Sequence, residues 1–205
     1  MHITLKNNHI AISFTYNERL VACMRNLPSR KYDPRTKAWY IPVQSAYESV
    51  RLLESKGFSV SGEARQALED SEAIRKRADE LRTAKDTEFA TSLPLYPFQK
   101  VVASFMVETG SCLNACGVGT GKSLQFIASS VKLNRARHLI VCPKSLMFYW
   151  REEILKWLPD ANVIIAKGNK NERLKLYKNV DKMSKFYFII NYDLIRIDVD
   201  DIINI

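Results

Sequence analysis

The chain has 205 residues, of which 46% are apolar and 26% charged, and this composition excludes collagen-like, low-complexity and fully disordered proteins. No apolar run reaches the roughly 18 residues that a membrane span needs, and the chain starts without the basic-then-apolar order of a signal peptide, so we expect a cytoplasmic protein with no membrane partner. The net charge of +9 suits a polyanionic partner, and four cysteines without a Cys-x-x-Cys pair disfavour a zinc site.

Residues 1–62 carry short strand-like and helix-like segments, which predict a small α+β domain. Strands are predicted at residues 2–6 and 10–14, because the intervening Asn7-Asn8 pair tolerates the positive φ of a tight hairpin turn. A helix that ends at Pro28, a second hairpin over residues 31–41 with its turn at Asp33-Pro34, and a helix over residues 46–56 that ends at Gly57 are predicted next.

Residues 63–90 are rich in Glu, Arg, Lys and Ala and contain neither Gly nor Pro. This composition predicts one exposed helix that links two domains. Its acidic and basic side chains nearly balance, so the basic surplus lies in the segments on either side.

Residues 91–205 alternate between helix-like and strand-like segments. The predicted strands are residues 112–116, 138–142, 162–166 and 186–191, and the predicted helices are residues 97–108, 122–133, 145–157 and 171–178. Short apolar strands separated by helices favour a parallel sheet covered on both faces. The expected fold class is therefore α/β: a small α+β domain, a helical linker, and a sheet lobe with a phosphate-binding loop.

The loop precedes the helix predicted at residues 122–133 and reads Ala-Cys-Gly-Val-Gly-Thr-Gly-Lys-Ser over residues 115–123. Gly119 and Gly121 permit successive amides to converge, with the positive end of the helix, into an anion nest. Lys122 offers a charge to the β- and γ-phosphates, and the Ser123 hydroxyl offers a ligand to Mg²⁺. The strand–loop–helix context favours this interpretation over an incidental glycine-rich turn. The predicted ligands are ATP and Mg²⁺, and the predicted nucleotide-binding residues are Gln99, Gly119, Thr120, Gly121, Lys122 and Ser123.

Three further polar sites flank the loop in the sequence. The Gln99 carboxamide can donate and accept, which suits the edge of adenine and, together with the loop, favours adenine recognition over a plain polar residue in a first helical turn. Lys144 and Ser145 follow a predicted strand and suit a DNA backbone phosphate, although an ordinary helix cap at Ser145 explains them equally well. The strand over residues 186–191 ends in a polar cluster, Asn-Tyr-Asp, at an edge where sheets of this kind bind ligands.

Four short sequence motifs, taken in chain order, resemble the first motor lobe of Swi/Snf-type ATPases within the superfamily-two helicases. That family shows Leu-Arg-Pro-Tyr-Gln, Gly-x-Gly-Lys-Thr, Val-x-Cys-Pro-x-Ser-Leu-x-x-x-Trp and Ser-Tyr-Asp, which are similar to residues 95–99, 119–123, 141–150 and 191–193 here. Tyr96, Ser123 and Asn191 depart from the family pattern, and Cys116 stands where a strict phosphate loop has glycine. The resemblance implies a RecA-like lobe and a DNA-dependent ATPase.

Residues 27–42 resemble the core of the HARP domain, named for HepA-related proteins, which precedes the motor in annealing helicases. The resemblance implies binding to branched DNA or to a junction of single and double strands. Tyr32, Trp39 and Tyr40 could stack on bases, although for Trp39 we favour a place in the core of this small domain. With Lys144 and Ser145, the predicted DNA-binding residues are Arg30, Lys31, Arg35 and Lys37.

Residues 1–205 contain no Asp-Glu-x-His motif of the kind that holds Mg²⁺ and orients the attacking water, and the family's second lobe is absent from them. Asp198, Asp200 and Asp201 are expected to be solvated charges. We therefore expect the N-terminal part of a Swi/Snf-type ATPase, with domains at residues 1–62, 63–90 and 91–205, that binds ATP but hydrolyses little alone and that a second polypeptide could complete. The alternative is a non-catalytic DNA-binding or interaction protein with a relic motor half.

Overall fold

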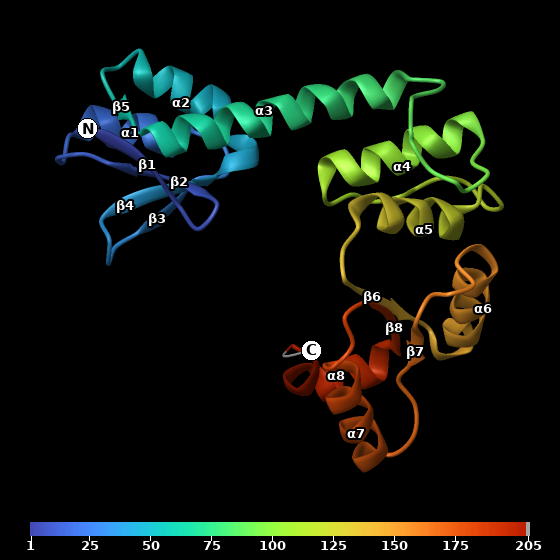
Figure 1. Cartoon of the computed structure of the whole chain (residues 1–205). Coiled ribbons are helices and arrows are strands. Elements are labelled where there is room, and N and C mark those ends of the chain that lie inside the picture. The colour runs from blue at the N-terminus through green and yellow to red at the C-terminus, as the bar shows by residue number, and fades with distance from the viewer. Residues whose placement is uncertain (204–205) are drawn as a thin grey trace. The chain divides into compact units, whose positions relative to one another are not determined.

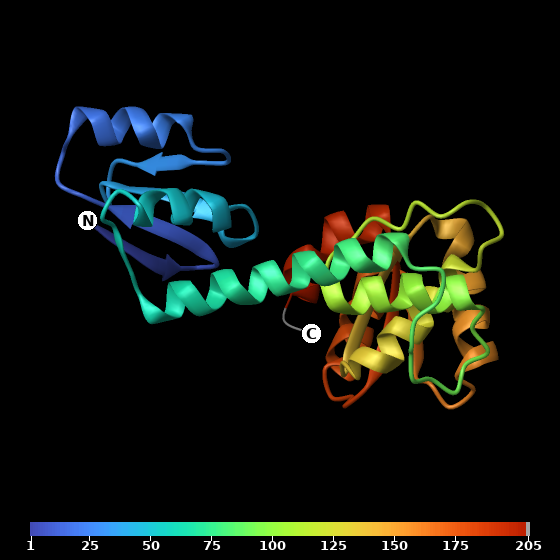
Figure 2. The same ribbon diagram turned by 90° about the horizontal axis from the view of Figure 1, so that it is seen from above.

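The computed structural model describes residues 1–203 and divides into two compact units, the first formed by residues 1–80 and the second beginning at Leu81. Each unit has its own sheet (Figures 1 and 2). Each unit also has its own apolar core. None of the helices within residues 1–203 is long and apolar enough to cross a membrane.

The first unit is built on a five-stranded sheet with the order β3-β4-β2-β1-β5. Asn7 and Asn8 adopt φ values of 48° and 60°, so the predicted hairpin turn is present between β1 and β2. The second predicted hairpin is formed by β3 and β4, but its turn covers residues 34–37, because Asp33 still pairs with Ala38 as the last residue of β3. The strands are β1 (His2–Lys6), β2 (His9–Ser13), β3 (Lys31–Asp33), β4 (Ala38–Pro42) and β5 (Ser59–Val60).

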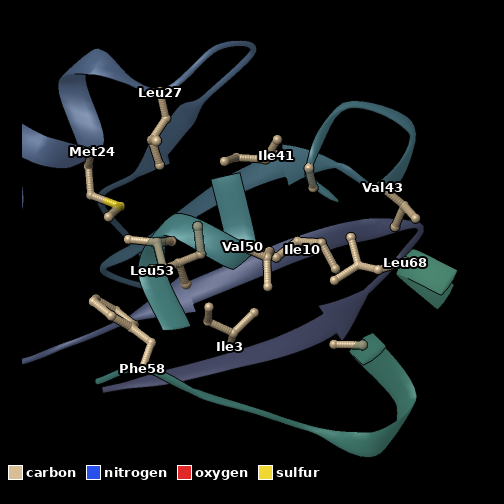
Figure 3. Packing of buried hydrophobic residues seen from close by; sticks show 13 residues of the cluster. Ile3, Ile10, Met24, Leu27, Ile41, Val43, Val50, Leu53, Phe58 and Leu68 are labelled. Carbon is tan, nitrogen blue, oxygen red and sulfur yellow. The ribbon is translucent and has the colours of Figure 1, made fainter. Parts of the chain in front are cut away.

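Helices α1 (Glu18–Asn26) and α2 (Tyr47–Glu54) contribute to the core of the first unit, as do Ala64 and Leu68 from the start of the next helix. Figure 3 shows Val50 and Leu53 of α2 among the apolar side chains of the sheet, including Ile3 and Ile10. Trp39 is half-buried and packs against this core, as predicted, while one side of its ring contacts the exposed ring of Tyr32 with centroids 5.1 Å apart.

The linker helix is shorter than predicted. Helix α3 (Gly62–Thr83) ends seven residues before the expected end at residue 90, and residues 84–96 form no regular helix or strand. Phe89 explains the early end, because its buried ring joins an apolar cluster with Ala103 and Ala128 of the second unit. Burying that aromatic ring outweighs the helix propensity of the charged residues around it.

The second unit contains a three-stranded parallel sheet with the order β6-β8-β7. Every residue of the central strand β8 is buried, and its side chains alternate between two cores. Helices α5 and α6 pack on one face and α7 and α8 on the other, which confirms the predicted parallel sheet covered on both faces. The elements are α4 (Pro97–Thr109), α5 (Lys122–Leu133), β6 (Arg137–Cys142), η2 (Lys144–Leu146), α6 (Met147–Trp157), β7 (Val163–Ile165), α7 (Lys170–Val180), β8 (Phe186–Asn191) and α8 (Tyr192–Ile202).

The strand predicted at residues 112–116 is absent. Among the described residues, β6, β7 and β8 pair only with one another, so this segment has no neighbouring strand to share backbone hydrogen bonds with. The Cys116 N–H donates instead to the side chain of Asn114, and Leu113 is 90% exposed. An apolar sequence therefore leads into the phosphate loop as an irregular segment.

Candidate nucleotide-binding site

The phosphate loop turns sharply into α5 through two left-handed glycines. Gly119 has φ of 80° and Gly121 has φ of 76°, a region that L residues with a side chain rarely adopt. At Gly121, a Cβ atom would also lie only 2.5 Å from Nε2 of Gln99. Glycine is thus required there by backbone conformation and by packing.

Lys122 reaches back across the loop that precedes it. Its Nζ donates to the carbonyl oxygens of Cys116 at 2.8 Å and Gly117 at 2.7 Å, while the Thr120 hydroxyl also donates to Gly117 at 2.9 Å. A lysine in the first turn of a helix adds positive charge to the positive end of the helix dipole. The two carbonyl groups offset part of this repulsion, and an anion at the same place would offset it further.

Ser123 follows Lys122 in the first turn of α5. It is half-buried, and its hydroxyl makes no hydrogen bond to any other group within residues 1–203. If the loop binds phosphate as predicted, this oxygen with available lone pairs would fit Mg²⁺, which takes one or two protein ligands together with phosphate oxygens and water. The part of the chain that the structure describes has no cluster of three or more His, Cys, Asp or Glu side chains suited to a metal ion.

Gln99 is 5% exposed and contacts the loop directly. Its Oε1 accepts from the Tyr96 N–H at 2.9 Å as part of a capping box of α4, and its Nε2 donates to the Thr120 carbonyl at 3.0 Å. Adenine recognition by Gln99 stays a prediction. The adjacent rings of Tyr96 and Phe98 are stacked and exposed, with centroids 6.1 Å apart, and they add an aromatic surface beside the loop.

Two residues at the loop were missed by the sequence reasoning. Gln125 in α5 is 0% exposed and donates to the Thr120 carbonyl at 3.0 Å, and Asn114 donates to Gln125 Oε1 at 2.7 Å. Two sequence signals could have indicated these residues. Gln125 is a carboxamide inside the apolar run of α5, and Asn114 stands two residues before Cys116, a spacing at which an asparagine side chain often accepts from a backbone N–H.

The carboxyl ends of β6 and β8 lie side by side, with Cys142 opposite Asn191. Asn191 Oδ1 accepts from the Leu194 N–H at 2.9 Å and so caps α8. Lys144 and Ser145 are exposed in η2, and no side-chain hydrogen bond caps α6. The helix-cap explanation for Ser145 is therefore wrong, and phosphate binding stays a prediction.

The first unit has an open pocket of about 790 Å³ at its β1–β2 and β3–β4 hairpins. Lys31 and Arg35, both predicted to bind DNA, line it, whereas Arg30 donates to the Leu27 carbonyl and neither Arg30 nor Lys37 lines the pocket. Lys6 and His9 were missed, although they flank the predicted turn. The lining includes Lys6, His9, Lys31, Tyr32, Arg35 and Tyr40, with Asp33 as its acidic residue.

Asp198 corrects a sequence-based expectation, because it is 1% exposed rather than solvated. Its carboxylate accepts from Arg173 Nε at 2.5 Å and from the Tyr177 hydroxyl at 2.7 Å. Hydrogen bonding to Arg173 lowers the pKa of Asp198 and raises that of Arg173, while burial raises the pKa of Tyr177. The acidic residue that sequence reasoning placed in solvent thus joins α8 to α7. Asp200 and Asp201 are exposed.

Comparison with known proteins gives one family match, to the SNF2-related domain, over residues 16–205. The chain is 27% identical over 190 residues to a bovine SWI/SNF-related matrix-associated actin-dependent regulator of chromatin subfamily A-like protein 1, a match covering 83% of this chain and 20% of the relative. The Xenopus laevis protein of that name is 24% identical over 216 residues, covering 96% of this chain and 22% of the relative.

A shorter match is to the ISWI chromatin-remodeling complex ATPase ISW2 of Saccharomyces cerevisiae, with 34% identity over 84 residues. It covers 38% of this chain and 8% of that protein. The chain therefore spans about a fifth or less of the length of these curated relatives.

Proposed function

The chain belongs to the SNF2-related domain family, and from this membership we propose that it is the N-terminal part of a DNA-dependent ATPase of the Swi/Snf type. In this proposal the second unit binds ATP with Mg²⁺ at the phosphate loop, and the first unit binds DNA as a HARP-like domain. The domain divisions at residues 1–62, 63–90 and 91–205 belong to the same proposal.

One observation carries the nucleotide site: the exposed Lys122 ammonium folds back onto the loop carbonyls at the positive end of α5. Two left-handed glycines, Gly119 and Gly121, shape the backbone before it. Together these features concentrate positive charge and loop backbone amides at the start of α5, an arrangement suited to a triphosphate. Ser123 would supply a hydroxyl ligand to the accompanying Mg²⁺, whose charge would stabilise the phosphate oxygens.

The DNA site of the first unit is supported by the chemistry of its pocket. Lys6, Lys31 and Arg35 provide cationic groups for backbone phosphates, and the rings of Tyr32 and Tyr40 provide surfaces on which unpaired bases can stack. Cationic groups combined with stacking surfaces suit DNA with a single-stranded region, such as a branch or a junction of single and double strands. Lys144 and Ser145 are a second, separate candidate for phosphate contact in the second unit.

Hydrolysis would need groups beyond those at the loop. Phosphoryl transfer requires a carboxylate or equivalent that orients the attacking water and helps to hold Mg²⁺, and residues 1–205 contain no Asp-Glu-x-His motif. We infer that these residues bind ATP without appreciable turnover. Further polypeptide, on the same chain or on a second one, would complete the motor.

A second candidate function is DNA binding without nucleotide chemistry. It is favoured by the first unit's separate core and pocket, neither of which draws on the phosphate loop. In that case the loop would be a relic, and the first unit alone would account for the activity.

Two binding titrations on the full chain separate these functions, one with Mg·ATP and one with a forked DNA. The ATPase proposal expects saturable binding of both ligands. Binding of DNA with no binding of Mg·ATP would overturn it in favour of the second candidate.

A further inference from the structure

Two buried carboxamides converge on a single carbonyl of the phosphate loop. Gln99 Nε2, from α4, and Gln125 Nε2, from α5, each donate to the Thr120 carbonyl oxygen at 3.0 Å. Gln99 is 5% exposed and Gln125 is 0% exposed. Burying two primary amides is costly unless their hydrogen bonds are made, and here both donate to the same loop atom.

The orientation of both carboxamides is set by backbone N–H groups. The Tyr96 N–H donates to Gln99 Oε1, which leaves Nε2 facing Thr120. On the other side the Cys116 N–H donates to Asn114 Oδ1, so Asn114 Nδ2 faces Gln125 Oε1 and Gln125 Nε2 faces Thr120. A backbone N–H only donates and a carbonyl only accepts, so these contacts admit one arrangement of oxygen and nitrogen in each amide.

Fixing the Thr120 carbonyl also fixes the Gly121 N–H. The peptide bond between them is trans, so the N–H points opposite to the carbonyl and away from the two glutamines. Gly121 has a left-handed φ, and glycine populates positive and negative φ about equally. The backbone of Gly121 therefore does not by itself hold the peptide in this orientation. Without an external constraint, this peptide could rotate and present its carbonyl oxygen where its N–H now points.

We propose that Gln125 and Asn114 are positioning residues that, with Gln99, hold the Thr120–Gly121 peptide so that the Gly121 N–H faces the phosphates of a bound nucleotide. The inference rests on the proposed binding of ATP. A rotated peptide would replace a hydrogen-bond donor by an acceptor beside an anion, which removes an attraction and adds a repulsion. The network therefore sets the phosphate-binding form of the loop before nucleotide arrives.

The sequence allows a direct spectroscopic test. Residues 1–205 contain two Thr-Gly peptides, Thr109-Gly110 and Thr120-Gly121. Labelling with ¹³C-carbonyl threonine and ¹⁵N glycine therefore leaves two amide signals, and Gly110, which ends α4, serves as the internal reference. In the wild-type chain, Mg·ADP should shift the Gly121 signal and leave the Gly110 signal in place.

Gln125→Met keeps the side-chain volume near its natural value but removes the donor. It should move the Gly121 signal before nucleotide is added, reduce the shift of that signal at saturating Mg·ADP, and weaken Mg·ADP binding by about tenfold, the size expected for one lost charge-assisted hydrogen bond. Asn114→Ala should act in the same direction, because it frees the Gln125 amide to turn over, and its half-buried position tolerates truncation.

Ser130→Ala is the matched control. Ser130 lies in the same helix and is buried, and its hydroxyl bonds to the Ile127 carbonyl and the Tyr187 hydroxyl rather than to the loop. This variant should lose stability while its Gly121 signal and its nucleotide affinity stay at wild-type values.

The inference is overturned if Gln125→Met and Asn114→Ala leave the Gly121 signal of the nucleotide-free protein in place, a result that needs no nucleotide binding. It is also overturned if both variants bind Mg·ADP as wild type does while Lys122→Ala does not, in which case the nucleotide site itself stands. Failure of the wild-type chain to bind any nucleotide would instead remove the proposed function and, with it, the purpose of the network.

Discussion

Arg173 of α7 and Asp198 of α8 form a two-point ion pair inside the second unit, with Nε to Oδ2 at 2.5 Å and a second guanidinium nitrogen to Oδ1 at 3.0 Å. Arg173 is 7% exposed and also donates to the Gly168 carbonyl at 2.9 Å. The pair fixes the two helices that cover one face of the sheet, because each partner satisfies the charge of the other away from water.

Asp198→Asn should destabilise the second unit by about 3–5 kcal/mol, the range for removing one partner of a buried ion pair and leaving the other charge unmatched. Urea unfolding of the variant and of wild type measures the difference. Asp201→Asn, at an exposed position of the same helix, is the control and should change stability by less than about 0.5 kcal/mol.

The same pair predicts an acid dependence. The pKa of Asp198 is lower in the folded protein than in the unfolded chain. Asp198 therefore contributes stability that is present above the unfolded pKa and is lost as pH falls through the folded pKa. Asp198→Asn should therefore show a flatter loss of stability below about pH 4 than wild type. If wild type and Asp198→Asn lose stability equally steeply as the pH falls, Asp198 is not the source of the acid dependence.

His138 predicts a second pH effect, in a higher range. Its ring stacks on Tyr187 with centroids 4.6 Å apart, its Nε2 is buried without a hydrogen-bond partner among the described residues, and burial lowers its pKa. The unfolded chain therefore binds the proton more readily, so stability should be full above about pH 6.5 and fall as pH drops below it. His138→Phe should remove this slope between pH 7 and 5, as followed by thermal unfolding; an unchanged slope would exclude His138 as its source.

Gly121→Ala should destabilise the loop by about 1–3 kcal/mol, because alanine would occupy a left-handed conformation and its Cβ would meet Gln99. Gly117→Ala is a matched control for stability, since its φ is not positive and the added Cβ would lie 3.9 Å from the nearest side-chain atom. Unfolding curves for the two variants should differ clearly. Equal stabilities would show that Gly121 is not constrained as the structure indicates.

Binding to DNA should depend on the pocket of the first unit. Replacing Lys6 or Lys31 with Ala should weaken binding to forked DNA and reduce the slope of log affinity against log salt by about 1 for each phosphate that the protein no longer neutralises. Lys56→Ala, which removes an equal charge from the same unit outside the pocket, should leave the slope unchanged. Fluorescence anisotropy at several salt concentrations gives both quantities, and equal slopes for all three variants would place the DNA elsewhere.

Much of the fold could be predicted because local signals agreed with long-range packing. Asn7 and Asn8 favour a tight turn, and the short apolar run of β8 between helix-like segments favours a strand buried on both faces. Residues 112–116 were predicted wrongly because strand formation needs a hydrogen-bonding neighbour, which propensity cannot supply. The early end of α3 depends on a distant partner in the same way, since the Phe89 ring packs against Ala103 and Ala128.

The geometry of the candidate site could be predicted where a short motif sets the backbone, as at Gly119 and Gly121, whereas phosphate binding by Lys122 stays a prediction. The geometry was not predictable where the effect depends on residues brought together by folding. Asn114 and Gln125 are 11 positions apart and come into direct hydrogen-bond contact only on folding, which also brings Gln125 to the Thr120 carbonyl. Asp198 appeared solvated in an acidic run, and its partner Arg173 lies 25 residues away.

The most direct measurement is an isothermal titration of Mg·ATP into the wild-type chain and into Lys122→Ala. The wild-type protein should bind one nucleotide saturably, and the variant should bind at least about tenfold more weakly, because it lacks the ammonium that is proposed to contact the phosphates. Equal affinities, or no binding by the wild-type chain, would contradict the assignment of the loop as a triphosphate site.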